Sequence, residues 1–229
     1  MAADAPGMPM RQVPLPFGFE RAGGFDAFVS GANAEAVEAL RQDVLPLPGI
    51  YLWGPPGSGK THLLHALAEA RHDRGERIGA FAASQPLPWT FDDGASLVLI
   101  DDCERLDAAQ QHAAFAVYIE ATARGVPVVA AGLLPPVDLA LRDDLRSRLG
   151  WGLVFALEPL SESDARDALR REAARRGIVV PDDVIDYLWA HRARDLTHLM
   201  ALLDRLDAYA LAEQRAVTVP LLRRMLESL

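Results

Sequence analysis

The chain has 229 residues, of which 50% are hydrophobic and 24% charged, the balance of an ordinary globular protein. Its formal net charge is −9 and Lys60 is its only lysine, so we expect no strong direct DNA binding, which needs a basic face. The apolar runs are too short to cross a bilayer, and no secretion signal or zinc-ligand spacing is visible. The single cysteine, Cys103, suits a reducing cytoplasm and is expected to pack as a small hydrophobe. We therefore expect a cytoplasmic protein without membrane contacts.

The first 24 residues contain four prolines and four glycines, which favour an extended tail. Residues 25–158 alternate short apolar runs with helical stretches, which predicts an α/β domain with a parallel sheet flanked by helices. The strands are expected at residues 49–53, 78–82, 97–100, 126–131 and 153–157. The helices are expected near residues 34–41, 60–74, 108–124 and 138–145.

Residues 159–229 show no further strand and predict a small all-helical domain. Ser161 and Asp164 open a first helix that ends near Gly177. A second helix follows Pro181, and a last one begins near Thr218. Between them, a third helix has a stripe of apolar residues at helical spacing. This stripe is either the core of the domain, the ordinary role of an amphipathic helix, or a binding face.

The expected first strand leads directly into a glycine-rich loop and then into an amphipathic helix, the Walker A arrangement for binding phosphate groups. The loop consists of Gly54, Pro55, Pro56, Gly57, Ser58, Gly59, Lys60 and Thr61. Its backbone N–H groups and the helix N-terminus attract oxyanions, while Lys60 reaches the β- and γ-phosphates and Thr61 ligates Mg²⁺. His62 is included in the nucleotide-binding set by its position alone. An ordinary glycine-rich turn is the alternative, which the flanking elements disfavour.

A second motif ends the apolar run at residues 97–100, where Asp101 and Asp102 follow a buried strand. About forty residues after a Walker A loop, this pattern is typical of a Walker B motif. Asp101 is predicted to hold Mg²⁺ through water, and Asp102 to polarise the attacking water. The alternative for the pair taken alone is a surface turn. Because aspartate is shorter than glutamate, hydrolysis is expected to be slow.

Three further stretches make the chain resemble the DnaA-type AAA+ proteins of bacterial replication initiation, and more narrowly the Hda family of short DnaA homologues that inactivate the initiator. They are residues 25–33, the Ser-Arg-Leu-Gly-Trp-Gly run at 147–152 with 157–160, and residues 203–207 with 217–220. The resemblance covers residues 12–229. It implies an AAA+ fold with a helical lid, an adenine pocket that includes Phe28 and Val29, and ADP or ATP with Mg²⁺ as cofactors.

The resemblance also assigns Arg148 as an arginine finger, which reaches the γ-phosphate held by another subunit and stabilises its transition state. The alternative is an arginine in a surface salt bridge. The sequence differs from the DnaA-type pattern at two positions that would sense the bound nucleotide. Residues 130–134 lack the expected polar sensor, and the lid sensor arginine falls at Thr197, with Arg194 as a substitute one turn earlier. Weak intrinsic hydrolysis and poor discrimination of ATP from ADP, or a preference for ADP, are therefore expected.

The tail contains Gln12, Leu15 and Phe17 in a pattern that looks like the motif by which Hda and other replication proteins bind the DNA sliding clamp. Leu15 and Phe17 would fill an apolar cleft, and the intervening prolines keep the peptide extended. The alternative is a proline-rich leader without a partner.

The sequence thus predicts a regulator that binds DnaA and the clamp and promotes hydrolysis of DnaA-bound ATP. The alternatives are a stand-alone AAA+ ATPase, such as a helicase loader, and a nucleotide-gated adaptor. Whether the chain forms a homo-oligomer stays open.

Overall fold

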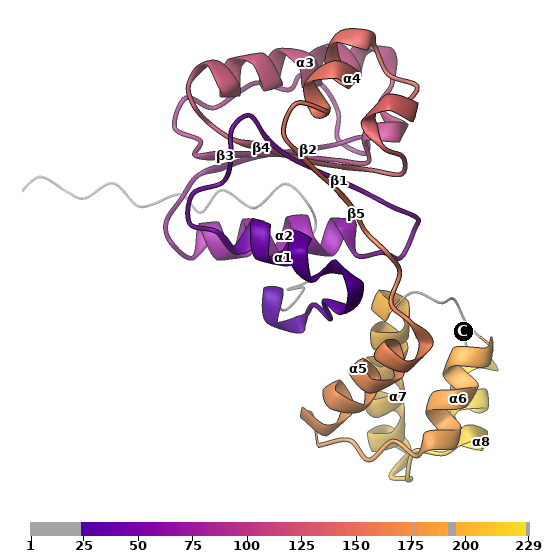
Figure 1. Cartoon of the computed structure of the whole chain (residues 1–229). Helices are drawn as coiled ribbons and strands as arrows, with labels where there is room; N and C mark the ends of the chain where they lie inside the picture. Colours follow the sequence, from indigo (N-terminus) through magenta and orange to yellow (C-terminus); the bar gives the residue numbers. More distant parts are fainter. Residues whose placement is uncertain (1–23, 176, 192–195, 228–229) are drawn as a thin grey trace, which may run out of the picture.

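The structure is a computed structural model of the chain and describes residues 24–175, 177–191 and 196–227. A five-stranded sheet forms the centre of its α/β part, in the order β2-β3-β4-β1-β5 (Figure 1). The strands are β1 (Gly49–Trp53), β2 (Ile78–Ala82), β3 (Leu97–Asp101), β4 (Val128–Gly132) and β5 (Leu153–Ala156). All neighbouring strands run parallel, so their carboxyl ends share one edge of the sheet. The predicted α/β class is therefore confirmed.

Helices cover both faces of this sheet (Figure 1). On one face, α1 (Ala34–Arg41) and α2 (Lys60–His72) pack on Ile50 and Leu52. On the other face, α3 (Ala108–Ala123) and α4 (Asp143–Leu149) pack on Tyr51. The alternation of side chains along β1 therefore divides the apolar core into two layers. Short 3-10 turns complete this part: η1 (Phe25–Ala27), η2 (Gly31–Asn33), η3 (Cys103–Arg105) and η4 (Pro136–Asp138).

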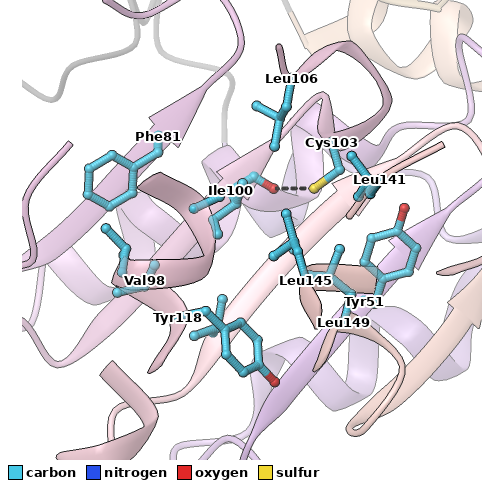
Figure 2. Packing of buried hydrophobic residues seen from close by; sticks show 14 of the residues in the cluster. Tyr51, Phe81, Val98, Ile100, Cys103, Leu106, Tyr118, Leu141, Leu145 and Leu149 are labelled. Carbon is cyan, nitrogen blue, oxygen red and sulfur yellow. Dashed lines mark hydrogen bonds between the residues drawn. The ribbon is translucent and has the colours of Figure 1, made fainter. Parts of the chain in front are cut away.

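Cys103 belongs to the same buried cluster as Leu106, Leu141 and Leu145, as Figure 2 shows. Only 1% of its surface is exposed, and its Sγ is 3.9 Å from the carbonyl oxygen of Ile100. Burial raises the pKa of the Cys103 thiol, which keeps it protonated. Cys103 therefore packs as a small hydrophobe, as expected.

The helix predicted at residues 138–145 is wrong in position. The chain forms η4 first, and Leu139 and Arg142 have extended backbone with ψ of 134° and 139°. Helix α4 begins only at Asp143. Two aspartates lie in its first turn, where their negative charges interact favourably with the partial positive charge of the helix N-terminus. This shift places Arg148 in the last turn of α4.

The fourth strand also begins two residues later than predicted. The N–H of Val126 donates to the carbonyl oxygen of Ala121, so Val126 belongs to the turn that follows α3. Pro127 has no N–H for a strand ladder. The ladder with β1 therefore starts at Val128, opposite Gly49.

The C-terminal part consists of α5 (Glu162–Arg175), α6 (Asp182–His191), α7 (Leu196–Glu213) and α8 (Val219–Glu227). These helices share a core of their own, and Figure 1 shows them gathered on one side of the α/β part. The apolar stripe of the third helix lies in that core, since Leu199, Leu203 and Leu206 are at most 2% exposed. Its predicted structural role is thus confirmed. The domain boundaries at residues 24 and 158 stay predictions.

One side chain links the start of the described chain to the connection between the two parts. Asn33, 4% exposed, donates from Nδ2 to the carbonyl oxygen of Glu158 at 2.9 Å. Its Oδ1 accepts from the Glu158 N–H at 2.8 Å. This paired contact fastens Glu158, which follows the end of β5, to η2.

Two glycines of the 147–152 run provide a test of the packing beside β5. A Cβ on Gly152 would overlap the backbone of Gly49, so Gly152→Ala should lower the free energy of unfolding by about 2–4 kcal/mol through steric strain. Urea unfolding followed by circular dichroism measures this change.

The control is Gly150→Ala, because Gly150 has a φ of −85° and its nearest neighbouring atom would be 3.6 Å from the added Cβ. This variant should stay within about 0.5 kcal/mol of the wild type. Equal stability of the two variants would show that β5 does not pack against β1 as described.

Candidate functional site

The glycine-rich loop connects the carboxyl end of β1 to α2. Gly59 is the N-cap of α2 and has a left-handed φ of 92°, and Gly57 has a φ of 79°. A Cβ on Gly54 would overlap the carbonyl oxygen of Leu157, and one on Gly59 would meet the ring of Phe28. Gly54, Gly57 and Gly59 are therefore required by this backbone.

Two polar side chains of the loop differ in their surroundings. The Oγ of Ser58 is buried and has no hydrogen-bond partner in the described structure. The Nζ of Lys60 donates to the carbonyl oxygens of Gly54 and Pro55 at 2.6 and 3.0 Å. Burial lowers the pKa of Lys60, while the charges of Glu104, Asp101 and Asp102 raise it. Lys60 is thus a cation held over the loop, where it fits a phosphate group.

The structure brings Thr61 and Asp101 together, as the magnesium prediction requires. Thr61 Oγ1 donates to Asp101 Oδ2 at 2.8 Å, and the N–H of Asp102 donates to Asp101 Oδ1 at 2.8 Å. Asp101 is only 5% exposed, and this burial raises its pKa despite both hydrogen bonds. Within the described residues, no group of three or more His, Cys, Asp and Glu side chains could hold a metal. A magnesium ion here would therefore need phosphate oxygens as additional ligands.

Asp102 lies at the same edge but has a second partner. Its backbone is left-handed, with φ 53° and ψ 43°, and its side chain is 38% exposed. The carboxylate is 3.7 Å from the guanidinium of Arg105. Its predicted role in polarising water stays a prediction.

The segment that resembles an adenine-pocket wall packs against the loop. The rings of Phe28 and His62 lie 5.4 Å apart, and His62 Nε2 is 3.2 Å from the carbonyl oxygen of Gly24. Burial lowers the pKa of His62, which favours its neutral ring. Val29 follows Phe28 and is half-buried. Residues 24–29 therefore lie beside the N-terminus of α2, as the resemblance implies.

Glu104, which was not among the predicted site residues, belongs to η3 and lies next to this site. Its Oε2 accepts from the N–H of Leu133 at 3.0 Å, just beyond β4. The only sequence signal was its place three residues after Asp101, beyond the end of a buried strand. The pairing of that turn with the end of β4 is a tertiary contact that no local pattern reveals.

Arg148 lies elsewhere. It occupies the last turn of α4, which leads into the amino end of β5, whereas the loop follows the carboxyl end of the parallel β1. Its guanidinium stacks 3.8 Å from the centre of the Trp151 ring. Among described residues Arg148 forms no salt bridge, whereas Arg142 and Arg146 pair with neighbouring aspartates. The structure therefore does not join Arg148 to the loop of the same chain.

Four predicted site residues fall outside the part of the chain that the structure describes. They are Gln12, Leu15, Phe17 and Arg194. The side chain of Thr197, the other candidate for the lid sensor, is also outside it.

The chain is similar to one family model and to several solved structures. Residues 162–226 match the family model described as "Hda, lid domain". Domain III of the Thermotoga maritima replication initiation protein DnaA has a TM-score of 0.74 at 21% identity, with 90% of this chain and 95% of that chain covered. AMPPCP-bound DnaA from Aquifex aeolicus has a TM-score of 0.65 at 20% identity, over 80% of this chain and 64% of that one. A single-residue variant of Thermotoga maritima RuvB gives 0.65 at 19% identity, over 90% and 72%.

The sheet, its flanking helices and the loop at β1 define an AAA+ protein, the class whose fold DnaA and RuvB share. Within that class, residues 162–226 are similar to the lid domain of Hda, and the fold of the chain is similar to that of DnaA domain III. None of the helices in the described residues is long and apolar enough to span a membrane.

The buried carboxylate of Asp101 leads to a prediction about stability. Because its pKa is raised in the folded protein, the folded state binds a proton more tightly than the unfolded state. Stability is therefore lost as the pH rises above the ordinary value of 3.8. Asp101→Asn keeps an acceptor for the Asp102 N–H and offers an amide N–H to the Thr61 hydroxyl, but removes the buried charge. It should raise the Tm of the nucleotide-free protein by a few degrees at pH 7.

Thermal unfolding between pH 4 and pH 8, followed by circular dichroism, checks this prediction. The matched control is Asp102→Asn, whose carboxylate is partly exposed and should give no such gain. A lower Tm for Asp101→Asn at pH 7 would count against a destabilising buried charge.

Proposed function

We propose that this chain is an adenine-nucleotide-binding regulator of replication initiation that inactivates DnaA. In this proposal the chain binds ADP or ATP with Mg²⁺, docks on ATP-bound DnaA and supplies Arg148 to promote its hydrolysis. Residues 12–17 tether the chain to the sliding clamp. The lid match and the DnaA-like fold support the part of this proposal that concerns replication initiation.

The glycine-rich loop supports the nucleotide part of the proposal. The Lys60 ammonium lies against the loop at the start of α2, a combination that suits the phosphate groups of a nucleotide. Thr61 and Asp101 would hold Mg²⁺ beside it. Two solved relatives are DnaA proteins bound to AMPPCP, an adenine nucleotide analogue. The contact between the rings of Phe28 and His62 supports an adenine-binding role for this segment.

The observation that carries the proposal is the position of Arg148. Arg148 lies near the amino ends of β5 and β1, whereas the loop follows the carboxyl end of β1. The five residues of β1 separate these two ends by about 15 Å, at 3.3 Å per residue. An arginine at the far edge of the sheet cannot serve the nucleotide of its own chain. It suits the γ-phosphate bound by a neighbouring molecule.

The surroundings of Arg148 support a role in contact with another protein. Trp151 is 58% exposed and lies under the guanidinium, which limits its orientations without neutralising its charge. Leu153 and Val154 on the edge strand β5 are 46% and 40% exposed. An unpaired cation bordered by exposed apolar side chains is typical of an interaction surface.

Arg148 would act on DnaA by electrostatic stabilisation. Its planar guanidinium donates hydrogen bonds to phosphate oxygens as negative charge develops on them during hydrolysis. The stack on Trp151 fixes the guanidinium before binding, which reduces the ordering cost of docking. The chain's own site suits nucleotide retention better than turnover, because Asp102 is partly engaged by Arg105.

A second candidate function is a stand-alone ATPase, such as a helicase loader. The contact between Thr61 and Asp101 favours it, because an assembled magnesium site serves hydrolysis as well as retention. It requires turnover by the isolated chain that depends on Asp102.

The finger assignment predicts the effect of Arg148→Ala. This variant should bind nucleotide and clamp like the wild type but lower the stimulated hydrolysis of DnaA-bound ATP at least about 100-fold, because fingers contribute about 10³–10⁵ in rate. Release of labelled phosphate from ATP-bound DnaA, with clamp loaded on DNA, measures this rate.

Arg146→Ala is the matched control, because Arg146 lies near Arg148 on α4 and pairs with Asp143. It should change the rate less than about threefold. Full stimulation by Arg148→Ala would exclude the finger role. ATP turnover by the isolated chain that is lost in Asp102→Asn would instead favour the ATPase.

The clamp assignment predicts that Gln12→Ala with Phe17→Ala weakens clamp binding at least about tenfold, through loss of directed hydrogen bonds and an apolar anchor. Surface plasmon resonance with immobilised clamp measures the affinity. The same double variant should retain nucleotide binding. Undiminished clamp binding would show that residues 12–17 are not the tether.

A further inference from the structure

The charged side chains of α4 are paired in a way that leaves Arg148 out. Asp143 pairs with Arg146 at 2.6 Å, three residues later. Asp144 pairs at 2.7 Å with Arg142, the residue that precedes the helix. Arg148 forms no salt bridge with any residue that the structure describes. The unpaired arginine of this helix is therefore the one that the proposed function requires.

Asp144 holds the position from which a carboxylate would normally bind Arg148. It lies four residues before Arg148 on α4, and an acidic residue four positions ahead of a basic one is the favourable order for an ion pair on a helix. Asp143 lies five positions ahead and does not face Arg148 in this way. Asp144 is thus the carboxylate of α4 that competes with a phosphate group for Arg148.

Arg142 occupies both carboxylate oxygens of Asp144. Its Nε donates to Oδ1 at 3.2 Å and its Nη2 donates to Oδ2 at 2.7 Å, the two-point contact of a guanidinium with a carboxylate. Asp144 Oδ1 also accepts from the N–H of Leu145 at 2.8 Å. Three donors therefore hold this carboxylate, and none of them belongs to Arg148.

Contacts with α3 hold Arg142 in place. Its backbone N–H donates to Oε1 of Gln111 at 3.0 Å, and its Nη1 is 2.8 Å from Nδ1 of His112. Its Cζ lies 6.0 Å from the centre of the Phe115 ring, within the range of a cation–π contact. Three residues of α3 thus position the arginine that holds Asp144.

Uncharged groups hold Arg148 instead. Its guanidinium stacks on the Trp151 ring. Its backbone carbonyl oxygen accepts from the Tyr118 hydroxyl at 2.9 Å and from the N–H of Trp151 at 3.1 Å. These contacts fix the residue and leave its positive charge without a counter-ion among the described residues.

We infer that Arg142 is a positioning residue that keeps Arg148 available to a phosphate group by occupying Asp144. Without Arg142, the Asp144 carboxylate would bind Arg148 and draw its guanidinium away from Trp151. An arginine paired in this way must give up its carboxylate before it can bind a phosphate group, which weakens its action. This inference rests on the finger role proposed above and adds how the finger is kept free.

Arg142→Gln tests the inference, because it removes the charge but keeps the backbone N–H that bonds to Gln111. The rate at which the full chain stimulates hydrolysis of DnaA-bound ATP should fall about three- to fivefold, the range that an exposed ion pair can produce. Adding Asp144→Asn removes the competing carboxylate and should restore the wild-type rate. A merely structural loss at residue 142 would persist in this double variant.

Arg146→Gln is the matched control. It removes the same charge from α4 but releases Asp143, which is five positions from Arg148. It should change the stimulated rate less than about twofold.

A second readout needs no partner protein. Nuclear magnetic resonance of the Arg148 Nε–H group in the isolated chain, assigned by its absence from Arg148→Ala, should show a ring-current shift from Trp151 in the wild type. This shift should shrink in Arg142→Gln and return in the double variant, because the guanidinium leaves the ring only when Asp144 can bind it.

Three results would overturn the inference: an unchanged rate in Arg142→Gln, a double variant as slow as Arg142→Gln, or the same ring-current shift in wild type and Arg142→Gln. A wild type that does not stimulate DnaA would overturn the proposed function. The resonance of Arg148 would then still decide whether Arg142 keeps this arginine free of Asp144.

Discussion

The parallel pairing of β1, β3 and β4 is the constraint on which the site depends. Because the three strands run in one direction, the loop after β1, the aspartates after β3 and the turn after β4 meet at one edge. The hydrogen bond from Thr61 to Asp101 closes this arrangement across β4, which lies between β1 and β3. The same pairing places the amino end of β5, and with it Arg148, at the opposite edge. One sheet thus separates the glycine-rich loop, which we propose binds phosphate, from the arginine that we propose acts on another molecule.

Much of this arrangement could be predicted from the sequence because its signals are local. The loop has a fixed spacing between a strand and a helix, and Asp101 ends an unbroken apolar run. Helix α4 was misplaced because the extended backbone at Leu139 and Arg142 depends on tertiary contacts, such as the Arg142 N–H bond to Gln111. Glu104 was missed for the same reason, since its partner Leu133 is 29 residues away.

The only lysine of the chain lies at this site. Lys60 is surrounded by carboxylates and bonded to loop carbonyls, so its position is defined without a second cation. The burial of Asp101 and the left-handed backbone of Asp102 both cost stability. Such costs concentrate where a ligand is to be held, and the two apolar layers of the sheet offset them.

The double hydrogen bond between Asn33 and Glu158 limits how the helical part can move. It holds Glu158 to the α/β part, and α5 begins at Glu162. A movement of α5–α8 as one body must therefore rotate about residues 159–161, which lie between these two points. Pro159 restricts the backbone there, which leaves Leu160 and Ser161 as the main axes of rotation. The hinge is therefore short, and the lid is expected to move along a narrow arc rather than sample many directions.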